Sequence, residues 1–148
     1  MTKIETCTKI AWHFLGQPYI WGGDDPVAGF DCSGFCIEIL KSVGMLPRSG
    51  DWNANMLQGR FIESAMNSES MPEEGYLVFW NSRLDCSRII HVEYCLDSYL
   101  SIGASGGGSD NVTVQAAIKR NAYIKVRPFR SRDNIYGFVD PFAEERNQ

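Results

Sequence analysis

The chain has 148 residues, 44% of them hydrophobic and 22% charged, and this balance predicts one globular domain over 1–148. Its formal net charge of -4 argues against nucleic acid as the main partner, because phosphate binding depends on clustered Lys and Arg. The one basic run, RPFRSR at 127–132, is expected to be a solvated loop. No stretch reaches the roughly 18 consecutive apolar residues of a membrane-spanning helix, so no membrane span is expected.

The N-terminal residues lack the apolar core and the small-residue cleavage site of a signal peptide. The chain is therefore expected to be made in the cytoplasm and to reach any external target by a non-Sec route. Five cysteines occur at irregular spacing without a CxxC pair, so neither a metal site nor another cofactor is expected. Cys7 and Cys86 could form a disulfide outside the cytosol, although no feature of the sequence fixes that pairing.

The first half of the chain has helical periodicity. Apolar residues at helical spacing predict an amphipathic helix over 3–15, and an ordered loop rich in Gly, Pro and Asp follows over 17–31. A second helix is predicted from Cys32 to Val43, with Asp31 as its N-cap. A short helix is expected to begin at Asp51.

The second half changes to the alternating pattern of strands. After a turn at 71–75, a hairpin at Asp97–Ser98 and a short helix over 112–120 are expected. The predicted strands are 76–80, 88–96, 99–104, 122–129 and 134–142. Helices that precede antiparallel strands indicate an α+β fold in a single domain.

The stretch FDCSGFCIEIL contains two cysteines with different predicted environments. Cys32 lies in the first turn of the second helix, where free N–H groups and the helix dipole favour a thiolate, the nucleophilic form. Gly34 and the preceding turn would leave its sulfur accessible. The alternative is a small apolar core residue, the usual role of a free cysteine and the one expected for Cys36.

A thiolate nucleophile also requires a base, and the chain has only two histidines. His13 is expected to be a surface residue of the first helix. His91 interrupts an otherwise apolar strand and shares a face with Glu93 and Cys95. A histidine on a rigid strand facing Cys32 would form the Cys–His arrangement of acyl-transfer enzymes.

The segment GQPYIWGGDDPVAGFDCSGF resembles the nucleophile segment of the NlpC/P60 family of papain-like cysteine peptidases, whose pattern is Tyr-x-x-Gly-Gly, a loop, then Asp-Cys-Ser-Gly. GYLVFW and HVEYCL resemble the family strand before the histidine strand and the histidine strand itself. The resemblance covers about Gly16 to Val139 and implies a papain-like fold with N-terminal helices on a central antiparallel sheet. The C-terminal portion resembles phage and prophage members.

The resemblance implies that Cys32 attacks a peptide carbonyl and that His91 is the general base and later the acid. Tyr19 matches the tyrosine that helps to stabilise the oxyanion. Asp31 and Ser33 match positions that hold the free amine of a short cell-wall peptide, although both residues could simply cap the helix. Trp21, in the loop before the nucleophile, is the candidate to line the substrate groove.

One position departs from the family pattern. The family usually places a third polar residue, often a second histidine, on the strand after the histidine strand, and that position is Gly103 here. Three side chains are conceivable substitutes: Glu93 on the face of His91, and Ser101 and Ser105 on the side of the empty position.

The resemblance implies a hydrolase that cleaves an amide bond in peptidoglycan stem peptides through a Cys32 thioester, with the bond between D-glutamate and a diamino acid as the first expectation. A phage tail or another delivery machine is the expected partner for reaching the wall. Two alternatives stay open: a catalytically weak binding or assembly module, suggested by Gly103, and an acyltransferase or amidase on substrates outside the wall.

Overall fold

The computed structural model describes residues 1–20, 23–25, 29–106 and 113–148. The helices of this part of the chain are α1 (Lys3–His13), α2 (Cys32–Ser42), α3 (Ala54–Arg60), α4 (Val114–Arg120) and α5 (Ala143–Arg146), with 3-10 turns η1 (Ile62–Ser64) and η2 (Phe129–Ser131). The strands are β1 (Asp24–Asp25), β2 (Gly29–Phe30), β3 (Leu77–Asn81), β4 (Ile89–Cys95), β5 (Leu100–Ser105), β6 (Tyr123–Pro128) and β7 (Ile135–Val139).

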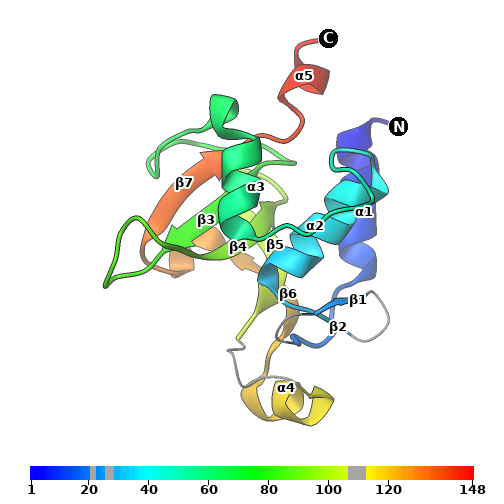
Figure 1. Cartoon of the computed structure of the whole chain (residues 1–148), viewed down its shortest axis with the longest axis vertical. Helices are drawn as coiled ribbons and strands as arrows, with labels where there is room; N and C mark the ends of the chain where they lie inside the picture. Colours follow the sequence, from blue (N-terminus) through cyan, green and yellow to red (C-terminus); the bar gives the residue numbers. More distant parts are fainter. Residues whose placement is uncertain (21–22, 26–28, 107–112) are drawn as a thin grey trace.

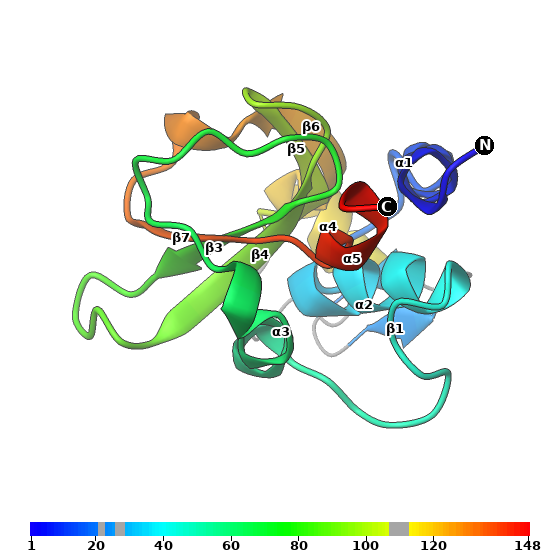
Figure 2. The same cartoon turned by 90° about the horizontal axis from the view of Figure 1, so that it is seen from above.

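The five longer strands form one antiparallel sheet in the order β6-β5-β4-β3-β7. Helices α1 and α2 lie together on one side of this sheet, and α2 packs on the central strands β4 and β5 (Figures 1 and 2). Both termini lie at the end of the molecule opposite α4 (Figure 1). The predicted α+β architecture with helices on an antiparallel sheet is confirmed.

Most predicted elements occur with ends shifted by one or two residues, but two boundaries were wrong and one pair of strands was missed. The short helix begins at Ala54 rather than Asp51, because Asn53 is its N-cap and accepts a hydrogen bond from Met56 N. The last strand ends at Val139, because Asp140 accepts a hydrogen bond from Phe142 N and turns the chain into α5. The two-residue strands β1 and β2 were not predicted.

Local capping explains where the two N-terminal helices begin. Thr2 and Glu5 form a reciprocal capping box at the start of α1. At the start of α2, the carboxylate of Asp31 accepts a hydrogen bond from Gly34 N at 2.6 Å. This cap fixes the direction in which the first turn of α2 presents Cys32.

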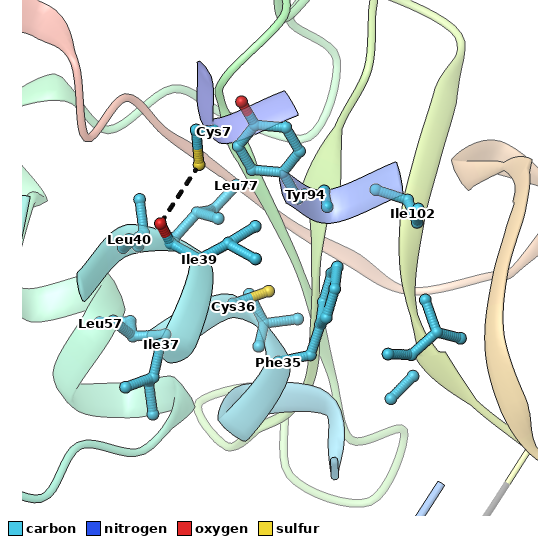
Figure 3. Close-up of a cluster of buried hydrophobic side chains, with 14 of the residues drawn as sticks. Cys7, Phe35, Cys36, Ile37, Ile39, Leu40, Leu57, Leu77, Tyr94 and Ile102 are labelled. Carbon is cyan, nitrogen blue, oxygen red and sulfur yellow. Dashed lines mark hydrogen bonds between the residues drawn. The ribbon is translucent and has the colours of Figure 1, made fainter. Parts of the chain in front are cut away.

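Two apolar clusters cover the two faces of the sheet. The larger contains the inward side of α2 together with Leu77, Tyr94 and Ile102 of the sheet, and Cys7 of α1 donates a hydrogen bond to the carbonyl of Ile39 (Figure 3). Val78, Trp80, Cys95, Phe129 and Phe138 form the smaller cluster. Side chains alternate between the two faces along a strand, so Trp80 of β3 points to the face of the smaller cluster. Its cross-strand partner on β4, His91, lies on the same face.

The cysteines do not form the disulfide that the sequence left open. All five thiols are free, with Cys7 buried beneath α2 and Cys86 exposed in the loop before β4. In the part of the chain that the structure describes, no helix has both the length and the apolar character needed to cross a membrane.

Candidate active site

The two cysteines of α2 lie in different environments. Cys32 is the first residue of the helix and is partly exposed, whereas Cys36, one turn later, is fully buried. Burial raises the pKa of the Cys36 thiol well above its usual range, so Cys36 stays a neutral core residue. Only Cys32 combines an accessible sulfur with a helix N-terminus.

His91 lies near the middle of β4 and is 5% exposed. Its ring stacks at a tilt on Trp80, its partner on β3, with the ring centroids 5.0 Å apart. The Nε2 atom lies 2.6 Å from Oε2 of Glu93, and Cys32 lies close enough to raise the pKa of the ring. Because Nε2 is engaged by Glu93, Nδ1 is the ring nitrogen left for the thiol.

These contacts determine the charge of His91. Burial lowers the pKa of His91, but the hydrogen bonds to Cys32 and Glu93, together with their charges, outweigh burial and raise it to about 9. The imidazole is therefore protonated at neutral pH. An imidazolium beside a sulfur is the pairing that stabilises a reactive thiolate.

Glu93 is a fully buried carboxylate whose oxygens are all engaged. Oε1 accepts a hydrogen bond from Ser101 Oγ at 2.8 Å, and Oε2 lies 2.6 Å from His91 Nε2 and 3.3 Å from Arg127 Nη2. Burial raises the pKa of Glu93, but His91, Arg127 and Ser101 together hold it below its usual range. Glu93 is thus an ionised group with a cation on each side.

Gly103 lies directly beneath this side chain. A Cβ atom built at position 103 would overlap Cγ of Glu93 and lie 3.0 Å from its Cβ and Cδ atoms. Real Cβ contacts of this kind essentially never occur, so Glu93 lies where a side chain of residue 103 would begin. The position that departs from the family pattern is therefore filled from the neighbouring strand.

The other two candidates for the third group are placed differently. Ser101 contacts Glu93 rather than His91. Ser105 is buried at the far end of β5, opposite Tyr123, and among the described residues no hydrogen bond joins it to His91.

Tyr19 is brought to the site by a short segment attached to β6. Gly16 N donates to Ile124 O, Ile124 N donates to Gln17 O, and Tyr19 N donates to Ala122 O, all at 2.8–2.9 Å. The Tyr19 side chain is 5% exposed, and burial with the nearby charges of Cys32 and Asp31 raises its pKa. The phenol therefore keeps its proton, and its O–H can donate a hydrogen bond to a developing oxyanion.

Asp31 and Ser33 line a polar pocket of about 270 Å³ beside the N-terminus of α2. Asp31 Oδ1 is occupied by the helix cap and also accepts a 3.4 Å hydrogen bond from Ser33. Glu38, Lys41 and Trp52 form other parts of the wall. Trp21, the candidate for lining the groove, lies outside the described residues.

Sequence reasoning missed two cations at the site. The run 127–132 is not a solvated loop: Arg127 belongs to β6 and contacts Glu93, while Phe129 is buried. The Arg132 guanidinium lies over the Trp80 ring, 5.6 Å from its centroid, and its charge acts on Cys32 and Tyr19. The basic run is visible in the sequence. Its position at the site depends on the pairing of Arg127 on β6 with Ser101 on β5, which the sequence does not show.

Among the described residues, no group of three His, Cys, Asp or Glu side chains is arranged to hold a metal ion. The residues that converge at the N-terminus of α2 are instead a thiol, an imidazole, a carboxylate and a phenol.

Comparison with known protein families assigns most of the chain to one family. The model of the NlpC/P60 family matches residues 16–130, which include Tyr19, Cys32, His91 and Glu93. The chain belongs to the NlpC/P60 family. The match covers well over half of the chain and extends from the segment that holds Tyr19 to the end of β6.

Several NlpC/P60 proteins are similar in sequence. The bifunctional muramidase/DL-endopeptidase CwlT of Bacillus subtilis is 36% identical over 93 residues, covering 62% of this chain and 26% of CwlT. The murein DD-endopeptidase MepH of Escherichia coli is 32% identical over 87 residues, covering 55% of this chain and 30% of MepH. The chain thus spans less than a third of the length of these relatives.

Solved structures of the family have the same fold. The NlpC/p60 domain of the peptidoglycan hydrolase SagA matches with a TM-score of 0.62 and 26% identity, covering 93% of this chain and 97% of that domain. NlpC2 from Trichomonas vaginalis gives a TM-score of 0.72 at 14% identity, covering 93% of this chain and 46% of NlpC2, which supports the fold alone.

Proposed function

We propose that the protein is a cysteine hydrolase that cleaves an amide bond in the stem peptide of peptidoglycan. The observation that carries this proposal is the placement of Cys32, at the N-terminus of α2, next to the buried His91, whose ring contacts Glu93 at 2.6 Å. A thiol and a charged imidazole in this arrangement are equipped for acyl transfer.

The reaction proceeds in two halves. The Cys32 thiolate attacks the carbonyl carbon, His91 gives its proton to the leaving nitrogen, and the C–N bond breaks to leave a thioester on the sulfur. His91, now neutral, takes a proton from water, whose oxygen attacks the thioester. The C–S bond then breaks, and the Cys32 thiolate and the His91 imidazolium are restored.

The oxyanion of each tetrahedral intermediate needs donors that are already in place. The phenol of Tyr19 and the backbone N–H groups at the start of α2, ahead of the Gly34 N–H that Asp31 caps, are suited to this task. A preorganised donor of this kind typically contributes about 3–4 kcal/mol to transition-state stabilisation.

The substrate class rests on the relatives and on the charges around the site. CwlT is named a DL-endopeptidase and MepH a murein DD-endopeptidase, and both names describe peptide-bond cleavage in the wall. Asp31 and Ser33 offer oxygens to a free amine, and Arg132, whose charge acts on Cys32, offers a cation to a carboxylate. A stem peptide carries both groups, and the bond between D-glutamate and a diamino acid is our first choice.

The alternative of a weak binding module rested on the missing side chain at position 103. Because Glu93 lies over Gly103 and reaches His91, that reason for expecting poor catalysis is weakened. The acyltransferase alternative uses the same thioester and differs only in whether water or an amine accepts the acyl group. Delivery by a phage tail or another machine stays a prediction.

The test compares the wild-type protein with Cys32→Ala on purified peptidoglycan under reducing conditions, with Cys86→Ala as the matched control. We expect the wild type and Cys86→Ala to release new amino groups and stem-peptide fragments, and Cys32→Ala to release none. Mass spectrometry of the fragments identifies the bond. Equal release by wild type and Cys32→Ala would contradict the proposal.

A further inference from the structure

Glu93 and Gly103 are neighbours across the gap between β4 and β5. The ladder between these strands consists of the pairs Tyr94–Ile102 and Cys95–Ser101, so the next residues in sequence are Glu93 and Gly103. The Glu93 side chain occupies the space that a residue larger than glycine would need at position 103. One position has no side chain, and the position opposite has a side chain that fills the vacancy.

We infer that Glu93 is the positioning residue of His91, and that the absence of a side chain at Gly103 leaves the space that Glu93 occupies. The orienting group has moved from the strand after the histidine strand to the histidine strand itself. This inference deepens the proposed function and rests on it, since the role concerns how His91 serves Cys32.

The contacts of Glu93 favour this role over a purely structural one. A carboxylate with no exposure to solvent is costly to bury unless every oxygen is paired. Glu93 meets that condition with Ser101 and Arg127, and the remaining contact is the 2.6 Å approach to Nε2. Ser101 and Arg127, cross-strand partners of each other, hold the carboxylate in the orientation that fixes the ring.

The charge of Glu93 distinguishes it from an amide or imidazole in the same place. An anion on Nε2 stabilises the protonated ring, as the third group of a serine triad does. The charged and titratable groups that act on His91 or Glu93 come from α2, β4, β6 and the loop after η2: Cys32, Arg127 and Arg132, with Cys36 and Cys95 buried nearby. Among the described residues, Glu93 is the only carboxylate that acts on the pKa of His91.

The first experiment follows the imidazole itself and needs no substrate. The two histidines give a simple ¹H–¹⁵N side-chain NMR spectrum, in which the exposed His13 is an internal reference. We expect Glu93→Gln, which keeps the shape of the side chain and removes its charge, to lower the pKa of His91 by about 1 or more. Glu63→Gln, an exposed carboxylate removed, should leave it unchanged.

The second experiment measures kcat and KM on wall fragments. Glu93→Gln should lower kcat by about 10- to 1,000-fold with little change in KM, because a misplaced imidazole affects proton transfer rather than binding. Gly103→Ala should lower kcat as well, since its Cβ displaces Glu93, whereas Gly59→Ala, where a Cβ meets open space, should not. Circular dichroism and melting temperature establish that each variant is folded.

A double-mutant cycle tests whether a side chain at position 103 can replace Glu93, and it distinguishes this from a general loss of activity. Gly103→His should lower kcat in the wild-type background, where Glu93 fills the site, and raise it in the Glu93→Ala background, where the space is free. An effect of the same sign in both backgrounds overturns the inference. So does a His91 titration that is unchanged in Glu93→Gln. If the wild type cleaves no wall at all, the proposed function fails while the NMR titration still decides the inference.

Discussion

At the scale of single residues, burial separates groups of identical chemistry. Cys32 and Cys36 are one helical turn apart, yet one sulfur is partly exposed at a helix start and the other is enclosed by the core. His13 and His91 differ in the same way, since one is exposed and the other is buried against a carboxylate. Reactivity follows from these surroundings, and the residue type alone does not supply it.

Tyr19→Phe tests the oxyanion role of the phenol. The ring packs in the core and stays there in the variant, so the melting temperature should change little, whereas kcat should fall by about 100- to 1,000-fold as one donor is lost. Steady-state kinetics on wall fragments measures the effect. A raised KM with an unchanged kcat would assign Tyr19 to substrate binding instead.

The sequence predicted the individual residues of the site better than their partnerships. Alternation along a strand was enough to place Glu93 on the face of His91. It did not predict that Gly103 faces Glu93, because that depends on the β4–β5 register, and a slip of one residue exchanges the faces. Arg127 was missed for the same reason, since its role depends on its register with Ser101 on the neighbouring strand.

At the scale of elements, the start of α2 serves both stability and chemistry. Asp31 ends the preceding loop, caps the helix through Gly34 N and lines the polar pocket. Gly34 has no space for a side chain, because a Cβ there would overlap the carbonyl oxygen of Gly23. The loop and the helix therefore fit together only with glycine at this position.

Asp31→Asn and Asp31→Ala separate the two tasks of this residue. Asparagine is as good an N-cap as aspartate, so Asp31→Asn should keep the melting temperature, while Asp31→Ala should cost about 1–2 kcal/mol of stability. Both variants lack the carboxylate and should raise KM for fragments with a free N-terminal amine. Thermal unfolding and kinetics on matched free and acetylated peptides provide the measurement. If Asp31→Asn keeps the preference for the free amine, Asp31 does not bind the amine and serves only as the helix cap.

Elements of five or more residues were predicted from the sequence, whereas β1, β2 and α5, which have two to four residues, were not. The helices at Lys3–His13 and Cys32–Ser42 contain two to three turns of apolar periodicity with recognisable caps. The pair β1 and β2 has two residues in each strand, too few for any alternation to be detected. The helix α5 is one turn that depends on the contact of Arg146 with Asp140, a tertiary interaction.

At the scale of the whole molecule, the sheet connects segments that are distant in the chain. Residues 16–19 attach to β6, which begins more than a hundred residues later, and α2 packs on β4 and β5. Cys32, His91, Glu93 and Tyr19 therefore meet only when the sheet is complete. Loss of sheet order would separate all four at once.

This dependence predicts how stability varies with pH. The folded-state pKa of His91 is raised to about 9 from 6.5, so its stabilising contribution is complete below about pH 6.5 and is lost as the pH rises toward 9. The pKa of Glu93 is lowered from 4.5, so its contribution is present above about pH 4.5 and is lost as the pH falls further. The pair therefore stabilises the fold most between these limits.

Urea unfolding at pH 5.5, 7 and 8.5 in reducing buffer measures the alkaline limb. We expect the wild type to lose up to about 3 kcal/mol of unfolding free energy between pH 5.5 and 8.5 from His91, and Glu93→Gln to lose clearly less, because the carboxylate no longer holds the proton on the ring. The pKa values of the buried thiols of Cys7 and Cys36 are raised in the folded state. They therefore reduce stability only where thiols of the unfolded chain ionise, near pH 9, and the series ends at pH 8.5 to avoid this effect. Glu63→Gln should retain the wild-type slope. Equal slopes in wild type and Glu93→Gln would show that Glu93 does not stabilise the imidazolium.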